Sequence, residues 1–140
     1  MKGCSALIIH ESAENYLETI LILQKRNGQV RSIDIVNEMG VTKPSVSVAM
    51  KNLRQSGMIE MDAGGYITLQ ESGLAIAEKI FERHTILTEW LIHLGVSPEV
   101  ADEDACKIEH VISPESFLAI KKQFQESPKR SSRDLPSHLL

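Results

Sequence analysis

The segment CKIEHVIS, residues 106–113, contains three side chains of types that commonly bind metal ions. They are the thiol of Cys106, the carboxylate of Glu109 and the imidazole of His110, at positions i, i+3 and i+4. On a helix this spacing places all three side chains on one face. Sulfur, oxygen and nitrogen ligands together suit a divalent transition metal. A buried cysteine, a surface glutamate and a partly exposed histidine without any metal would have the same sequence, so the motif alone does not establish a metal site.

Other metal-ligand types occur in two further segments that are expected to be helical. His84 lies about one helix upstream of Cys106, and Asn15 and Glu18 are i, i+3 in the first predicted helix. With Cys106 as thiolate and both glutamates ionised, the combined set carries about three negative charges, which a divalent ion would largely offset. The candidate metal ligands are therefore Asn15, Glu18, His84, Cys106, Glu109 and His110.

A second kind of chemistry is indicated by residues 41–59, which contain Lys43, Lys51 and Arg54 and no acidic residue. In a chain of net charge −4 this is a local reversal of sign. Phosphate contacts require such a basic patch, and short hydroxyl side chains contact phosphates or base edges. A solvated helix face is the simpler alternative. The candidate DNA-binding residues are Arg31, Thr42, Lys43, Pro44, Ser45, Ser47 and Lys51.

The first half of the chain has the pattern of a winged helix-turn-helix. Apolar spacing predicts a helix over about 11–25 with Ser12 as its cap, and Ser32 is expected to cap a short helix that Gly40 ends. Thr42 then caps a second helix to about residue 56. Residues 58–70 alternate around AGG and predict a two-stranded hairpin. Helix, glycine turn, helix and hairpin is the order typical of this DNA-binding fold.

The second half is predicted to be entirely helical, over about 71–94, 97–112 and 113–125. The apolar coverage of the first of these helices exceeds what one small DNA-binding domain needs, which indicates packing against a second subunit. We therefore expect a mainly α fold, a winged helix-turn-helix domain followed by an all-helical dimerisation domain. The expected boundaries are 1–75 for DNA binding, 76–126 for metal binding and dimerisation, and 127–140 for a flexible tail.

Composition restricts the class of protein. A chain of 140 residues with 42% hydrophobic residues is an ordinary globular protein. It has only two cysteines and no apolar run near the roughly 20 residues of a membrane span, so we expect a reducing, cytoplasmic location without membrane contact. The HExxH motif of zinc hydrolases is missing, and a hydrolase would leave the winged helix unexplained, so an enzyme is not expected.

Four segments resemble the diphtheria toxin repressor and manganese transport regulator family of metal-dependent repressors. They are ESAENYLETI, GVTKPSVSVAMKNL, ESGLAIAEKIFERHTIL and DACKIEHVIS, and the resemblance extends over about residues 11–125. It implies a homodimeric repressor that binds double-stranded operator DNA, with the metal held by the first helix and the dimerisation helices. The family's ligand positions correspond here to the six candidates above. Longer members add an SH3-like domain, which this chain is expected to lack.

The resemblance also bears on the metal. The manganese branch typically has Asp at the position of Asn15 and Glu at that of Cys106, whereas the iron branch has Met and Cys. The iron branch also places an ancillary ligand at the position of Asp102. A thiolate favours later, softer metals, so we expect Fe²⁺ first and Mn²⁺ next, with Zn²⁺, Co²⁺ and Ni²⁺ binding in vitro. The alternative function is a winged-helix regulator that senses an oxidant or a small organic ligand through Cys106.

Overall fold

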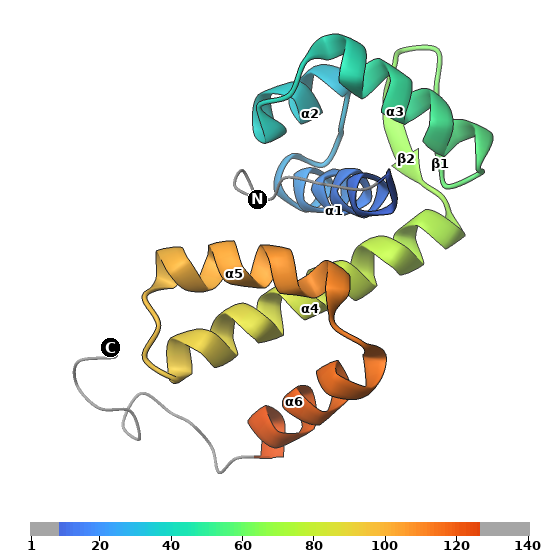
Figure 1. Ribbon diagram of the computed structural model, residues 1–140. Coiled ribbons are helices and arrows are strands. Elements are labelled where there is room, and N and C mark those ends of the chain that lie inside the picture. Colours follow the sequence, from blue (N-terminus) through green and yellow to red (C-terminus); the bar gives the residue numbers. More distant parts are fainter. Residues whose placement is uncertain (1–8, 127–140) are drawn as a thin grey trace. The chain divides into compact units, whose positions relative to one another are not determined.

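The computed structural model describes residues 9–126, with side chains from residue 12 onward, so the predicted tail 127–140 lies outside the described residues. Within this range the chain is mainly helical with one small hairpin, which confirms the predicted fold class (Figure 1). Two compact units divide at Phe81 and Glu82, inside the fourth helix. The elements are α1 (Ile9–Asn27), α2 (Ser32–Met39), α3 (Lys43–Gln55), β1 (Ile59–Met61), β2 (Ile67–Leu69), α4 (Glu71–His93), α5 (Pro98–Val111) and α6 (Pro114–Glu126).

The first unit is a winged helix-turn-helix in which α1 packs against α2 and α3. Gly40 adopts the left-handed conformation, with φ of 67°, between α2 and α3. The side chain of Thr42 caps α3, as predicted, by accepting a hydrogen bond from the backbone N–H of Ser45. The core of the unit is apolar and lies between these helices and the hairpin, with Leu17, Ile20, Ile35, Val46, Met50 and Leu53 among its buried residues.

Two predicted caps are wrong. Ser12 lies inside α1, because that helix begins at Ile9. The cap of α2 is Arg31, not Ser32, because the Asp34 carboxylate accepts the backbone N–H of Arg31 at 2.9 Å and so fixes the helix start one residue earlier.

The side chain of Arg26 donates a hydrogen bond to the Glu38 carboxylate at 2.9 Å, linking the end of α1 to α2. This hydrogen bond and the negative charge of Glu38 raise the pKa of the Arg26 guanidinium.

The wing is the antiparallel hairpin of β1 and β2, in which Met61 pairs with Ile67. Its turn is held by Asp62, whose Oδ1 accepts the backbone N–H of Gly64 and of Tyr66, each at 2.9 Å. Behind the hairpin, the first turn of α4 approaches the backbone of Met58. A Cβ added to Gly73 would overlap the Met58 carbonyl oxygen, so only glycine fits there.

The second unit contains the remainder of α4 with α5 and α6. Its small core is built around Ile86, Leu87, Ala105 and Phe117. Ser97 caps α5, as its sequence position suggests. None of the described helices combines the length and apolar character that a membrane crossing requires.

Candidate metal centre and nucleic-acid interface

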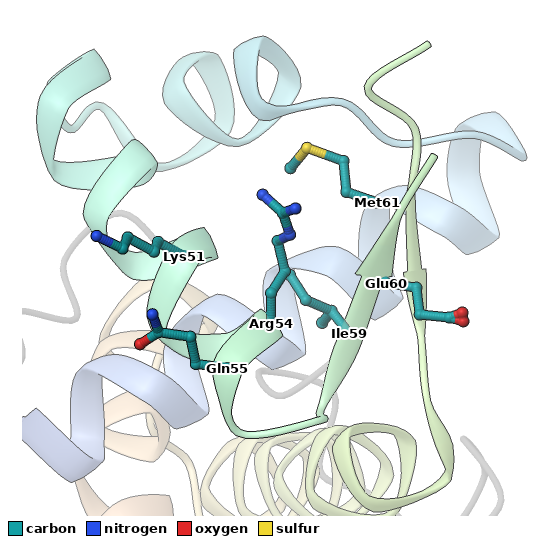
Figure 2. A pocket seen from close by; sticks show the side chains of 6 residues that line it. All are labelled: Lys51, Arg54, Gln55, Ile59, Glu60 and Met61. Carbon is teal, nitrogen blue, oxygen red and sulfur yellow. The ribbon is translucent and has the colours of Figure 1, made fainter. Parts of the chain in front are cut away.

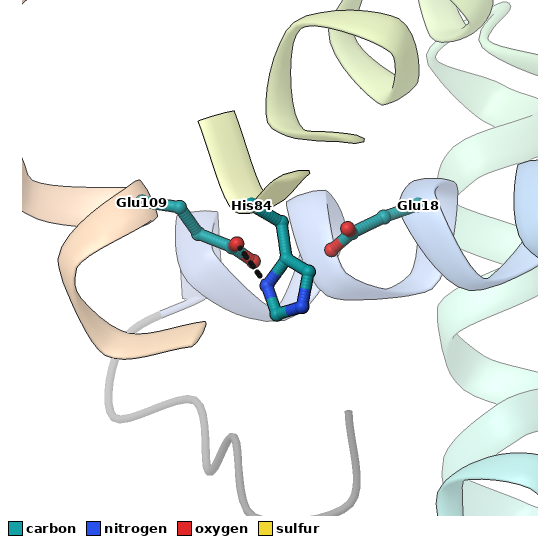
Figure 3. A group of neighbouring side chains, drawn as sticks. All are labelled: Glu18, His84 and Glu109. Atoms are coloured by element: carbon teal, nitrogen blue, oxygen red, sulfur yellow. Dashed lines mark hydrogen bonds and ion pairs between the residues drawn. The ribbon is translucent and has the colours of Figure 1, made fainter. Parts of the chain in front are cut away.

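The second unit contains an imidazole held between two carboxylates. His84, on α4, has its Nδ1 2.8 Å from Oε2 of Glu109 (Figure 3). Its Nε2 lies 2.8 Å from Oδ1 of Asp102. The Glu109 side chain is fully buried, whereas that of Asp102 is about half exposed, at 49%. If a metal took one ring nitrogen, the other could still donate to a carboxylate, which is how metal-binding histidines are usually oriented.

His110 and Cys106 extend this cluster along α5. Nε2 of His110 lies 3.5 Å from Oε1 of Glu109, and its side chain is almost completely buried. Cys106 is buried one turn before Glu109, on the same inward face of the helix, as the i, i+3 spacing predicted. Metal ligation by Cys106 would require its sulfur as the reduced thiolate. Carboxylate, imidazole and thiol donors on a buried face fit a divalent transition metal.

Asn15 and Glu18 lie on α1, in the first unit. They are one turn apart, and both are buried. Burial also raises the pKa of the neighbouring Tyr16 phenol. Glu18, labelled in Figure 3, is a buried carboxylate, and carboxylate oxygen is a common ligand of divalent metals.

Arg83 is a functional candidate that the sequence reasoning missed. It is only 6% exposed, and its Nη1 donates to the backbone carbonyl oxygens of Glu109, at 3.1 Å, and of Ile112, at 2.9 Å. Its guanidinium also lies over the ring of Phe117, 5.4 Å from the centroid. Arg83 thus binds the last turn of α5, which carries Glu109 and His110, and contacts α6. The available sequence signal was its position in the buried stripe of α4 between Ile80 and Leu87.

The candidate DNA-binding residues of α3 are exposed near its N-terminus. Thr42 and Ser45 are joined by a hydrogen bond between their hydroxyls, at 2.8 Å. Pro44 occupies the first turn, where its missing N–H costs nothing. Lys43, Ser47 and Lys51 are all exposed on the same helix.

Arg31 differs from these residues, because its guanidinium already has partners within the protein. It donates to the carbonyl oxygen of Gly64 at 2.8 Å and lies over the ring of Tyr66. Arg31 therefore contacts the wing, and any contact with phosphate would be made from that position.

A shallow groove of about 620 Å³ lies between α3 and β1 (Figure 2). Two cationic side chains and one carboxylate line it, which extends the basic character of α3 toward the wing. The lining residues are Lys51, Arg54, Gln55, Ile59, Glu60 and Met61.

Comparisons with known proteins agree with this architecture. Residues 9–65 match the family described as iron dependent repressor, N-terminal DNA binding domain, and residues 70–137 match iron dependent repressor, metal binding and dimerisation domain. The transcriptional regulator MntR of Escherichia coli O6:H1 is 36% identical over 111 residues, which is 79% of this chain and 72% of that protein.

Two solved structures show the same relationship. The manganese regulator SloR matches with a TM-score of 0.72 and 26% identity, covering 84% of this chain and 54% of SloR. T. acidophilum IdeR matches with a TM-score of 0.72 and 25% identity, covering 86% of this chain and 55% of IdeR. The chain spans just over half the length of these two proteins. The relatives are transcriptional regulators and not enzymes. The chain belongs to the diphtheria toxin repressor and manganese transport regulator family of metal-dependent transcriptional repressors.

Proposed function

We propose that this chain binds operator DNA as a cytoplasmic homodimer when a divalent metal occupies its ligand set. The observation that carries the proposal is the buried Glu109 carboxylate, which lies 2.8 Å from the His84 ring and 3.5 Å from that of His110. A carboxylate and two imidazoles in one helical unit, following a winged helix-turn-helix, are what a metal-controlled DNA-binding protein requires. The proposed ligands are Asn15, Glu18, His84, Cys106, Glu109 and His110.

Fe²⁺ is the metal we favour, with Mn²⁺ next. A Cys106 thiolate is a softer ligand than the carboxylate that manganese regulators typically have there, and Asn15 supplies a neutral oxygen in place of a charged one. Both differences move the preference away from Mn²⁺. Similarity to SloR, which is described as a manganese regulator, keeps Mn²⁺ as the second candidate.

The metal would control DNA binding by acting as a clamp, because the proposed ligands come from both units of the chain. Binding would restrict the winged unit and set the spacing of the two recognition helices in the dimer, and two half-sites must be met at a fixed separation. Since a ligand shifts an equilibrium only by its differential affinity, the metal must bind the DNA-competent arrangement more tightly. Operator DNA should then tighten metal binding by the same factor.

The test is a DNA-shift titration under anaerobic, reducing conditions, with the DNA upstream of the protein's own gene. Chelator alone, Fe²⁺, Mn²⁺ and Zn²⁺ are compared. We expect a shift only with metal, and its loss in Glu109→Gln. Glu103→Gln is the matched control, because Glu103 is an exposed carboxylate on the same helix. An equally strong shift in chelator would contradict the metal switch.

The same assay distinguishes the proposed metal switch from the alternative function, an oxidant sensor. A regulator that responds to an oxidant through Cys106 would ignore chelators and change its DNA affinity with peroxide. A Cys106→Ser protein would then lose the peroxide response and keep its DNA binding. The proposed metal switch predicts the opposite pattern, with a strong response to chelator in the wild-type protein.

A further inference from the structure

The outward face of α3 carries one side chain that its surroundings do not explain. The buried face of this helix is formed by Val46, Met50 and Leu53. A helical period of 3.6 residues puts the opposite positions furthest into solvent. Those positions are Pro44, Val48, Lys51 and Gln55, and all four are exposed. Val48 is therefore an apolar side chain at the middle of the solvent-facing stripe, and it is 59% exposed.

Folding does not account for a valine at this position. An exposed isopropyl group contributes little burial, and β-branching makes valine a weaker helix former than the polar residues expected there. Among side chains 12–81, the other large apolar group classed as exposed is Ile33, on α2, at 45%. Val48 is thus the more exposed of the two, and it lies on the helix that carries the candidate DNA-binding residues.

The neighbours of Val48 indicate what could cover it. Lys51, three residues further along α3, lies on the same face and gives it a positive charge, and the neighbouring Ser45 and Ser47 are small and exposed. No acidic residue occurs in residues 41–59. A single apolar group beside a lysine is too small for a hydrophobic protein contact, which needs a patch of a few hundred Å². It fits a polyanion that presents isolated apolar groups.

B-form DNA is such a polyanion. In its major groove the thymine C5-methyl is the characteristic apolar group, and it distinguishes thymine from the other bases. We propose that Val48 is a specificity-determining residue, which selects thymine by contact between its isopropyl group and the C5-methyl. Each operator half-site would contain a thymine opposite the middle of α3. The inference rests on the proposed DNA binding and adds to it the base that this position reads.

The experiment begins by selecting duplexes from a random pool with the full chain and Mn²⁺. In the selected duplex each thymine is then replaced singly by deoxyuridine, which lacks only the C5-methyl. Affinity is measured by fluorescence anisotropy for the wild type, Val48→Ala and Ile33→Ala. In each half-site, replacing one particular thymine should lower the affinity of the wild-type protein for the duplex about fourfold, as expected for one buried methyl group.

Val48→Ala should bind the thymine and deoxyuridine duplexes equally at that position, with its affinity for a scrambled duplex unchanged. Alanine is the better helix former, so loss of the fold is not expected. Ile33→Ala should keep the fourfold ratio. If Val48→Ala kept the wild-type ratio at every thymine, or if no thymine were sensitive, the assignment to Val48 would be wrong while DNA binding stood. A wild-type protein that bound no duplex would overturn both proposals.

Discussion

The guanidinium of Arg31 lies over the ring of Tyr66, 5.0 Å from the ring centroid, and joins the start of α2 to the wing. The same side chain donates a hydrogen bond to the carbonyl oxygen of Gly64. Backbone contacts reinforce the link. Arg31 and Tyr66 form an isolated β-bridge, and the N–H of Ile67 donates to the carbonyl oxygen of Val30 at 2.8 Å. Through these contacts residues 30 and 31 lie beside β2 and support the hairpin.

Arg31→Ala should loosen the wing and weaken specific DNA binding through that motion. The stacking contact and the hydrogen bond together are worth about 1–2 kcal/mol, so the amide of Gly65 should exchange roughly tenfold faster. The slope of DNA affinity against salt concentration should stay at the wild-type value, because no phosphate contact is removed. Amide exchange and a salt titration measure the two effects.

Arg31→Lys separates this role from a direct phosphate contact. Lysine keeps the charge but lacks the planar group that stacks on Tyr66. The amide of Gly65 should therefore exchange as fast in this variant as in the alanine variant. If lysine restored wild-type DNA affinity, or if alanine lowered the salt slope by about one, Arg31 would be acting on phosphate instead.

Gly73→Ala should destabilise the first unit strongly. The added Cβ would meet the backbone carbonyl of Met58, which cannot rotate away as a flexible side chain could. Overpacking of this kind costs about 1–3 kcal/mol, and a backbone clash should reach the upper end of that range. Urea denaturation measures the loss. Ala substituted at Ser72, an exposed neighbour in the same helix turn, should change stability by less than about 0.5 kcal/mol.

The order of elements could be predicted from the sequence, because each depends on local patterns. Val46, Met50 and Leu53 recur at helical spacing and are buried, and Thr42 followed by Pro44 is a strong helix start. The cap of α2 was misplaced for an equally local reason. Ser32 is a good capping residue by type, but the Asp34 carboxylate reaches back to the Arg31 N–H instead.

The parts that could not be predicted depend on contacts between distant residues. Arg31 and Gly64 are 33 positions apart, and Arg83 bonds carbonyls 26 and 29 positions away. Arginine is usually a surface residue, so its burial at position 83 goes against its residue type. The grouping of Cys106, Glu109 and His110 was predictable, because their i, i+3 and i+4 spacing within one helix places them on one face. The approach of His84 to that helix depends on a contact 25 positions apart in the chain, so local spacing could not fix it. It was expected from the donor types and from the family resemblance.

Arg83→Met should destabilise the second unit by roughly 3 kcal/mol. Methionine fills most of the space but cannot donate, which leaves the buried carbonyl oxygens of Glu109 and Ile112 without their arginine partner. The end of α5 should then loosen, and Mn²⁺ affinity, measured by calorimetry, should fall. Lys107→Met is the control, since Lys107 is an exposed cation on α5 and should change neither quantity. Equal Mn²⁺ affinity in Arg83→Met and wild type would show that Arg83 stabilises the unit without positioning the ligands.

Asp102→Asn should weaken metal binding by about 10–100-fold with little change in stability. The Asp102 carboxylate lies 2.8 Å from Nε2 of His84 and can hold the ring in one orientation, whereas an amide is a weaker acceptor without charge. Competition with a fluorescent chelator measures the metal affinity. Asp104→Asn removes an exposed carboxylate two residues further along α5 and should have the wild-type affinity. The orienting role of Asp102 would be ruled out if the two variants bound metal equally well.

Cys106→Glu should shift the metal preference toward Mn²⁺. A carboxylate in place of the thiolate is a harder ligand, so the ratio of Fe²⁺ to Mn²⁺ potency in the anaerobic DNA-shift assay should drop below its wild-type value. The position is buried, and glutamate is larger than cysteine, so a stability measurement by urea denaturation must accompany the titration. Cys106→Ala provides the comparison, because it removes the thiol without adding a ligand and should lower the response to both metals. A Cys106→Ala protein with the full Fe²⁺ and Mn²⁺ responses would show that the sulfur is not a ligand, and the preference for Fe²⁺ would then lose its physical basis.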